Sequence, residues 1–217
     1  MTITLLYLLS GITAYLLGSI PFGFLIAKTK GIDIRTVGSG NIGATNVFRS
    51  VSKKLGIITF TLDFLKGCGG AALLPLLAYQ FAPDLPAGLS KDALPVFCGA
   101  FTIVGHNWTC FLGFKGGKGI ATSAGMLIGL SPWSMLIALG IWIVVFVTSR
   151  YVSVASIAAA FTLGIVVWPL HLKAYGIWFP AVLTVLALLA IWKHRSNIAR
   201  LRAGTESRFE FRKKGDA

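Results

Sequence analysis

Charged residues are scarce in this 217-residue sequence, and acidic residues are the scarcest. Only 12% of the residues are charged, against about 25% in an ordinary soluble domain, and 55% are hydrophobic. These values exclude a mostly solvated surface, and the 15 Phe and 6 Trp exclude disorder. The net charge is +13, and the basic residues lie between long apolar runs. That pattern predicts a membrane protein with one positive side, and it argues against a nucleic-acid-binding protein.

Cysteine is also rare, and all three cysteines, Cys68, Cys98 and Cys110, fall inside apolar runs. An odd number in such segments argues against a disulfide framework, and no His or carboxylate stands beside them at ligand spacing, so no metal site is expected. We expect small core side chains. The first residues lack a basic stretch and a small-residue cleavage site, so the first apolar run is expected to be a retained span.

The apolar runs predict an all-α, polytopic membrane protein of seven transmembrane helices in a single domain, 1–217. A spanning helix needs about 20 apolar residues. The stretch 119–148 is too long for one such helix and a tight fit for two, so hydropathy alone leaves six or seven spans open. The predicted spans lie near 3–27, 55–82, 94–112, 119–130, 132–148, 152–170 and 177–193.

The distribution of charge decides between six and seven spans. With seven, the basic segment 28–54, the short connections with Lys115, Lys118 and Arg150, and the tail from Lys193 onward all lie on one side. The opposite side then has the connections 83–93 and 171–176. Those two hold Asp84, Lys91, Asp92, His171 and Lys173. With six spans, Arg150 and the basic tail would cross over. The positive-inside rule therefore predicts seven spans with the N-terminus outside and the C-terminus cytoplasmic.

Three polar segments, 38–49, 113–119 and 194–206, would then face the cytoplasm at the membrane. Polar or irregular backbone at that depth is tolerated only where it is buried in protein or lines a wet cavity. One shared site is the economical explanation.

The first polar segment is rich in glycine and in hydrogen-bonding side chains. Its glycines allow φ > 0 and close approach to a ligand, and its backbone N–H groups and polar side chains predict an anion-binding concavity. Arg49 can add a bidentate phosphate contact. The alternative is a flexible cytoplasmic loop. The candidate residues are Ser39, Gly40, Asn41, Gly43, Thr45, Asn46 and Arg49.

The second polar segment runs directly into the short span 120–130. Glycines before a helix expose its first N–H groups, where the helix dipole favours an anion. Lys115 and Lys118 add positive charge. The alternative is an anchor whose lysines meet lipid headgroups, but that role does not need the surrounding glycines. The candidate residues are Gly116, Gly117, Lys118 and Gly119.

The third polar segment places His194 and Asn197 at helical spacing, so both are expected to share a face with the end of the last span. The alternative, a basic tail resting on anionic lipid, explains Arg208 to Lys214 better than it explains Asn197 and Glu206. Two intramembrane ions, Asp63 and Lys66, are spaced i, i+3 and predict a neutral pair, either structural or supporting the site.

This inventory suits the binding of phosphate-bearing species better than nucleophilic catalysis. No Ser–His–Asp order, nucleophile elbow or Walker sequence is present. No His is followed five residues later by Asp, so the His–Asp signature of the common glycerolipid acyltransferases is missing. The Asp-rich metal motif of membrane alcohol phosphotransferases is missing too. We therefore expect no metal and no cofactor.

Together the three segments resemble the bacterial membrane acyltransferases that use acyl phosphate and glycerol 3-phosphate. The resemblance extends from Gly18 to Phe209 and includes the run from Asp63 to Gly67. One departure is Thr109, where that family usually has Pro. The residues that match its three motifs are Ser39-Gly40-Asn41, Thr45-Asn46, Arg49, Gly105-His106, Phe114 to Gly119, His194, Asn197 and Glu206.

The resemblance implies a seven-span enzyme of the bacterial inner membrane whose active site faces the cytoplasm. It implies that the product is 1-acyl-glycerol 3-phosphate, made in the first step of phospholipid synthesis, and that neither CoA nor acyl carrier protein is the donor. Glu206 would hold the tail, with Asp63 and Lys66 as further support, and the glycines of the first two motifs would cradle acyl phosphate. The residues implied to bind the phosphate of glycerol 3-phosphate are Ser39, Arg49, Lys118, His194 and Asn197, the first four of them catalytic.

The expected reaction needs no enzyme nucleophile, because acyl phosphate is already activated. The sn-1 hydroxyl attacks the acyl carbonyl, and either the donor phosphate or His194 accepts the proton. The partners expected are the two substrates and the lipid bilayer, with no nucleic acid and no obligate protein partner, so the chain is expected to be a monomer. The rival interpretation is a transporter for an organic phosphate anion, whose broken helices would also aim at anions.

Overall fold

The computed structural model describes residues 2–81 and 93–210, and within these residues the regular secondary structure is entirely helical. Part of the charge used to predict topology lies outside the described residues, namely Asp84, Lys91, Asp92, Arg212, Lys213 and Lys214. The chain divides into two compact units, Met1–Pro132 and Trp133–Ala217. Each unit is described by itself.

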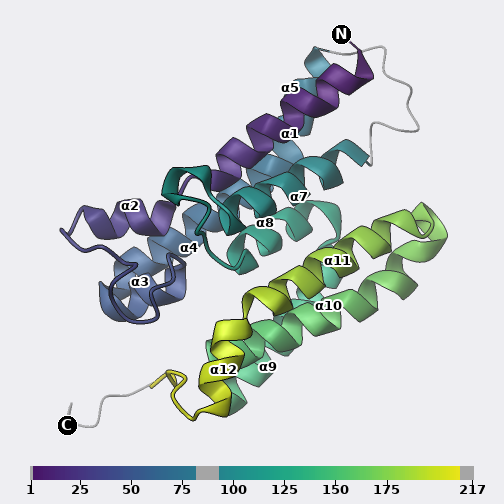
Figure 1. Ribbon diagram of the computed structural model, residues 1–217. Coiled ribbons are helices and arrows are strands. Elements are labelled where there is room, and N and C mark those ends of the chain that lie inside the picture. The colour runs from purple at the N-terminus through teal and green to yellow at the C-terminus, as the bar shows by residue number, and fades with distance from the viewer. Residues whose placement is uncertain (1, 82–92, 211–217) are drawn as a thin grey trace. The chain divides into compact units, whose positions relative to one another are not determined.

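The first unit contains the first two polar segments and the helices that hold them (Figure 1). Two of its three long apolar segments are interrupted, so several short helices replace the continuous spans expected from hydropathy. Its helical segments are α1 (Ile3–Ser19), α2 (Phe22–Lys28), α3 (Ala44–Ser50), α4 (Lys53–Cys68), η1 (Gly69–Leu73), α5 (Leu74–Gln80), α7 (Ala93–Asn107), η2 (Cys110–Leu112) and α8 (Ile120–Leu130).

The first predicted span, 3–27, is broken close to one end. Pro21 separates α1 from α2, because proline lacks the N–H group that would continue the helical bonding. Together the two helices form an apolar stretch, Ile3–Lys28, long enough to cross a membrane. The break leaves the carbonyl groups at the end of α1 without intrahelical donors.

The second predicted span, 55–82, runs from Lys53 to Gln80 as one helical stretch with a π-helical turn at Gly69–Leu73. Such turns are rare within α-helices and often occur at functional sites. The third predicted span, 94–112, is longer than the helix that forms there. Its helix α7 ends at Asn107, and a 3₁₀ turn, η2, follows at Cys110–Leu112.

Glycines allow the helices of the first unit to pack closely, as small residues do in membrane proteins. A Cβ atom at Gly18 of α1 would overlap the Thr102 carbonyl of α7, and one at Gly105 of α7 would overlap the backbone of α1. In the same way, Gly67 of α4 and Gly125 of α8 each lie against the partner helix's backbone. These two pairs, α1 with α7 and α4 with α8, fix the ends from which the polar segments emerge.

Apart from Pro132, the first residue of α9, the second unit contains α9 (Pro132–Ser149), α10 (Val152–Tyr175), α11 (Trp178–Lys193) and α12 (Arg195–Arg202). Helices α10 and α11 run side by side after a turn at Gly176, whose φ is +67° (Figure 1). Helix α10 continues five residues beyond the predicted end at 170, so His171 and Lys173 lie on the helix and not in a connection. Trp142 of α9 donates a 3.1 Å hydrogen bond to Ser156 of α10.

Among the described residues, four helical stretches are long and apolar enough to span a membrane: Ile3–Lys28, Lys53–Gln80, Pro132–Ser149 and Val152–Tyr175. Helices α8 and α11 are apolar but shorter. The 11 residues of α8 extend about 16 Å, roughly half of a hydrocarbon core. Large apolar side chains remain exposed on these helices, such as Phe161 at 63% and Val185 at 63%, as expected of surfaces that face lipid.

Candidate active-site segments

The first polar segment forms a tight loop that leads into α3. Gly38 and Gly40 have φ of +58° and +68°, the left-handed region that favours glycine. A Cβ atom at Gly38 would also overlap the side chains of Asn46 and Ser50. Gly43, in contrast, is extended and serves as the N-cap of α3. The helix itself, Ala44–Ser50, was not expected, because the sequence favoured a glycine-rich turn throughout this segment.

Asn46 organises this loop from its centre, where its side chain is buried. Its Oδ1 accepts hydrogen bonds from the Ser39 backbone N–H at 3.0 Å and from the Ser50 hydroxyl at 3.2 Å. Its Nδ2 lies 2.9–3.1 Å from the carbonyl oxygens of Ile34, Val37 and Asn41. The amide of Asn46 and the N–H of Ser39 are thus engaged inside the loop, where the sequence had suggested contacts with a ligand.

Asn41 has a similar local part, because its Oδ1 accepts a 2.8 Å hydrogen bond from the Gly43 N–H. The Ser39 and Arg49 side chains are exposed, and Thr45 is half-buried. Arg49 lies in the last turn of α3, and this helix packs on α4, where Gly56 lies against Phe48. The loop therefore presents a hydroxyl and a guanidinium on a rigid frame, which suits an anion.

The second polar segment folds back onto the end of α7. The Gly117 N–H donates a 2.9 Å hydrogen bond to the His106 carbonyl oxygen, and a Cβ atom at Gly116 or Gly117 would overlap His106. Packing against His106 therefore explains why glycine is needed at these two positions. The cradle for acyl phosphate that the resemblance implies here stays a prediction. Gly119 has φ of +79° and is the N-cap of α8.

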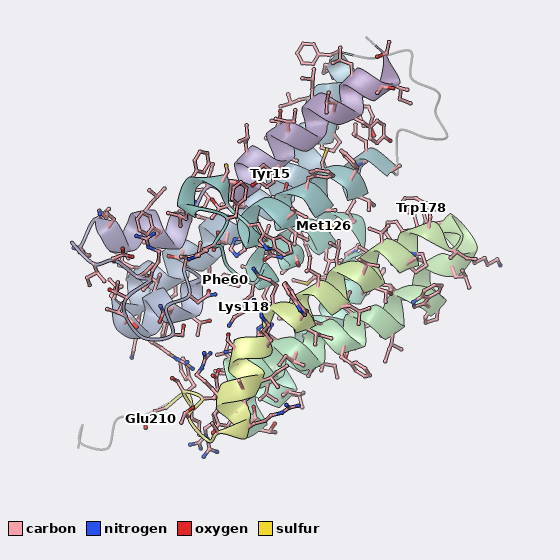
Figure 2. The ribbon with its side chains drawn as sticks, in the orientation of Figure 1. Tyr15, Phe60, Lys118, Met126, Trp178 and Glu210 are labelled. Atoms are coloured by element: carbon pink, nitrogen blue, oxygen red, sulfur yellow. The ribbon has the colours of Figure 1, made fainter. Side chains whose placement is uncertain are left out.

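Lys118 stands directly before that N-cap, at the end of α8 where the helix dipole is positive (Figure 2). Its side chain is half-buried, whereas Lys115 is exposed. A half-buried ammonium beside the start of a helix is suited to bind a phosphate. Of the two lysines in this segment, Lys118 is therefore the one whose position the fold restricts.

Asp63 and Lys66 form the buried ion pair that their spacing predicted. The Lys66 Nζ lies 2.9 Å from Asp63 Oδ1, and their side chains are 2% and 4% exposed. His106 Nδ1 lies 3.5 Å from the same carboxylate oxygen. Lys66 also donates hydrogen bonds to the carbonyl oxygens of Gly18 at 2.8 Å and Ile20 at 2.9 Å. The pair therefore connects α4 to the break in the first span and, through His106, to the second polar segment.

In the third polar segment the last span does not continue straight into the tail. Helix α11 ends at Lys193, His194 lies between the helices with φ −88° and ψ 5°, and α12 begins at Arg195. The helical continuity from which a face shared with the last span was expected is therefore broken at His194. The His194 Nδ1 lies 2.8 Å from the Ala190 carbonyl oxygen. Because a carbonyl only accepts, Nδ1 carries hydrogen, and Nε2 is the nitrogen that can take up a proton.

Glu206 ties the turn after α12 to two helices of the second unit. Its Oε1 accepts hydrogen bonds from the Ser153 hydroxyl and the Asn197 Nδ2, both at 2.7 Å. Its Oε2 accepts from Arg200 Nε at 2.7 Å. Burial alone would raise the pKa of Glu206, but the hydrogen bonds from Asn197, Ser153 and Arg200 outweigh it and lower the pKa below its ordinary value. Glu206 is therefore held as a carboxylate.

Ser153 was not predicted to belong to this group, because a lone serine at the start of a long apolar helix is not distinctive. The structure brings Ser153, Asn197, Arg200 and Glu206 together in the second unit. In the first unit it joins the second polar segment to Asp63 and Lys66 through His106. A site shared by the residues of all three segments stays a prediction. Among residues 2–81 and 93–210, no group of three His, Cys, Asp or Glu side chains is placed to hold a metal ion.

Comparison with known proteins gives one consistent result. Residues 8–204 match the family described as glycerol-3-phosphate acyltransferase. A protein of that name from Geobacter metallireducens is 50% identical over 197 residues, covering 91% of this chain and 94% of the relative. Another from Geotalea daltonii is 45% identical over 199 residues, covering 92% and 95%.

Two crystal structures of PlsY (YgiH), an integral membrane glycerol 3-phosphate acyltransferase, are similar to this chain. The glycerol 3-phosphate form has a TM-score of 0.80 at 41% identity and covers 94% of this chain and 96% of its own. The lysophosphatidic acid form has a TM-score of 0.78 at 40% identity, with 94% and 95% covered.

Proposed function

This chain belongs to the glycerol-3-phosphate acyltransferase family, and we propose that it transfers an acyl group from acyl phosphate to the sn-1 hydroxyl of glycerol 3-phosphate. The products are 1-acyl-glycerol 3-phosphate and inorganic phosphate, so the reaction begins phospholipid synthesis. The observation that carries the proposal is the match over residues 8–204, which includes the first two polar segments and the third as far as Gly204. Solved relatives with glycerol 3-phosphate and with lysophosphatidic acid support the acceptor and the product. The choice of acyl phosphate as donor follows from the motif resemblance.

We assign the phosphate of glycerol 3-phosphate to cationic and hydrogen-bonding side chains from the three segments. The exposed Ser39 hydroxyl and Arg49 guanidinium and the half-buried Lys118 ammonium suit this anion. His194 and Asn197 complete the set. Asn197 is held by Glu206, so the carboxylate acts by fixing its neighbours. The glycines at 40, 43, 116, 117 and 119, with Asn41, Thr45 and Asn46, shape the backbone that receives the donor.

The chemistry needs orientation and charge stabilisation more than a protein nucleophile. The sn-1 oxygen forms a bond to the acyl carbon as the bond from that carbon to the phosphate oxygen breaks, and the departing phosphate accepts the hydroxyl proton. Holding both substrates makes this attack effectively intramolecular. Positive charge and backbone N–H groups of the three segments stabilise the negative charge that develops on the carbonyl oxygen and on the departing phosphate. His194 Nε2 is the alternative proton acceptor, because Nδ1 is committed to Ala190.

For the membrane arrangement we propose seven crossings in the bacterial inner membrane, with the N-terminus outside and the C-terminus and active site cytoplasmic. The support is the positive-inside distribution of Lys and Arg. Helix α8 fits a count of seven crossings least well, because its 11 residues are short for a full crossing. Single cysteines placed at 40, 118 and 204 in a cysteine-free variant should react with an impermeant maleimide only after the inner face is exposed.

An assay of donor and acceptor specificity tests the proposed activity. The purified protein in detergent micelles is given glycerol 3-phosphate together with acyl phosphate, acyl-CoA or acyl carrier protein thioester, and lysophosphatidate is measured by mass spectrometry. We expect product from acyl phosphate alone. The absence of product, with uptake of glycerol 3-phosphate by vesicles that contain the protein, would overturn the enzyme and favour a transporter. We expect a monomer, which light scattering of the same sample checks.

A further inference from the structure

The break between α1 and α2 is a junction of buried polar contacts. Because Pro21 ends the helical bonding, the carbonyl oxygens of Gly18, Ser19 and Ile20 must find other donors. Lys66 donates hydrogen bonds to the carbonyl oxygens of Gly18 and Ile20, and the Ile20 oxygen also accepts one from the Phe22 N–H at 3.1 Å. The third, Ser19, accepts a 2.6 Å hydrogen bond from the hydroxyl of Thr109. Both donors are buried, with Thr109 1% exposed.

Thr109 also begins the segment that leads to Lys118. Its hydroxyl oxygen caps the turn η2 by accepting from the Phe111 N–H at 3.3 Å. Its carbonyl oxygen accepts from the N–H groups of Leu112 at 3.3 Å and Phe114 at 2.9 Å. Its φ of −65° is the angle that a proline ring would impose, but a proline would have no hydroxyl to reach Ser19. One side chain thus joins the broken end of the first span to the start of residues 110–119.

The far end of the same segment is secured separately. There the Gly117 N–H donates to the His106 carbonyl oxygen, directly before Lys118. Between these two attachments the backbone passes through left-handed conformations at Gly113 and Phe114, with φ of +61° and +60°. The non-glycine residue at such an angle persists only where its surroundings hold it. The bonds of Thr109 are therefore needed to keep this part of the segment in one conformation.

We propose that Thr109 is a positioning residue for acyl transfer, whose hydroxyl fastens the segment 110–119 to the break of the first span and so fixes Lys118. This inference rests on the proposed function, because it takes Lys118 to bind the phosphate of glycerol 3-phosphate. Removing the hydroxyl leaves the buried Ser19 carbonyl without this donor and loosens the start of the segment. Lys118 then spends less time in the position that binds phosphate.

Thr109→Val tests the proposal, because it removes the hydroxyl and keeps the branched shape. We expect the KM for glycerol 3-phosphate to rise about tenfold with a much smaller change in kcat, a size typical of one lost buried hydrogen bond. Thr109→Ser, which keeps the hydroxyl, should restore the KM. The matched control is Thr102→Val in the preceding helix α7. The Thr102 hydroxyl is equally buried, and its hydrogen bond within the described residues is the local one to the Cys98 carbonyl at 2.8 Å. The control should keep the wild-type KM.

Hydrogen exchange of the substrate-free protein gives a second measurement that does not depend on activity. Peptides covering 110–119 should exchange faster in Thr109→Val than in wild type or in Thr102→Val. A wild-type KM and wild-type exchange in Thr109→Val would overturn the proposal. So would an equal rise in KM in Thr102→Val, since that would indicate general loosening. If wild type itself makes no lysophosphatidate, the proposed function fails, whereas faster exchange at 110–119 would still show that the fastening exists.

Discussion

The buried pair of Asp63 and Lys66 allows a quantitative prediction, because its two members are not equivalent. Asp63→Asn removes the carboxylate but leaves the Lys66 ammonium bonded to two carbonyl oxygens, at 2.8 Å and 2.9 Å. Lys66→Met removes the ion pair and both of those bonds. The Asp63 carboxylate then stays buried, and the nearby group that could carry a positive charge is His106, whose Nδ1 lies 3.5 Å away. The lysine variant should therefore be the more damaging one.

Removal of one partner from a buried ion pair typically costs about 3–5 kcal/mol, and an unsatisfied buried carbonyl about 1–3 kcal/mol. We expect Asp63→Asn to lower the free energy of unfolding by about 3 kcal/mol and Lys66→Met by about 5 kcal/mol or more. The double variant leaves no unpaired charge, so it should be less destabilised than the sum of the two by about 2–3 kcal/mol.

The assay is reversible unfolding of the purified protein in mixed micelles by increasing SDS, followed by helical circular dichroism. Asp33→Asn is the control, because the Asp33–Arg35 pair is also a close ion pair, at 2.6 Å, but its side chains are 31% and 47% exposed. That control should unfold at the wild-type SDS fraction. If the Asp63 and Lys66 effects add within about 0.5 kcal/mol, or if Asp63→Asn is the worse variant, the reasoning from the buried network is refuted.

The remaining predictions concern the loop, the tail and the chemistry. Asn46→Ala should lower the free energy of unfolding by about 2–4 kcal/mol in the same SDS assay, because several backbone groups of the loop lose their partner. Asn46→Asp keeps the shape of the side chain but removes the Nδ2 donor, so it tests whether shape without that donor is enough. Glu206→Gln should destabilise by about 1.5–3 kcal/mol through its bond to Arg200. Folding lowers the pKa of Glu206, so its contribution to the free energy of unfolding is complete above its ordinary pKa of 4.5 and is lost as pH falls through the folded pKa. The thermal unfolding temperatures of wild type and Glu206→Gln should therefore converge at low pH. In steady-state assays, Lys118→Ala should abolish transfer. If His194→Ala still transfers the acyl group, the donor phosphate accepts the proton. If His194→Ala loses transfer but still binds glycerol 3-phosphate as wild type does, His194 is the base.

The features that could be predicted from the sequence are mainly local in the chain. The pairing of Asp63 with Lys66 follows from their i, i+3 spacing, and the structure confirms it at 2.9 Å. The start of α8 after Gly119 follows from glycine before an apolar run. The helical class follows from long apolar segments in a chain with few charges. Each of these depends on neighbours within one or two turns.

The features that could not be predicted depend on residues far apart in sequence. The carbonyl partners of Lys66 lie 46 and 48 residues away, and the Ser19 partner of Thr109 lies 90 residues away. The contact of Gly117 with His106 was likewise not predictable, because only the fold brings these two residues together. Short helices such as α3 were also hidden, because seven residues among glycines carry little periodicity.

The measurement that tests the central claim most directly is the stoichiometry of one reaction followed over time. The purified protein in micelles is mixed with acyl phosphate and glycerol 3-phosphate, and released phosphate and lysophosphatidate are quantified in the same samples, with the position of the acyl chain determined by mass spectrometry. The account predicts equal amounts of the two products at every time, the acyl chain on the sn-1 oxygen, and no phosphate release without the acceptor. Phosphate released without lysophosphatidate, or lysophosphatidate formed only from a thioester donor, would contradict it.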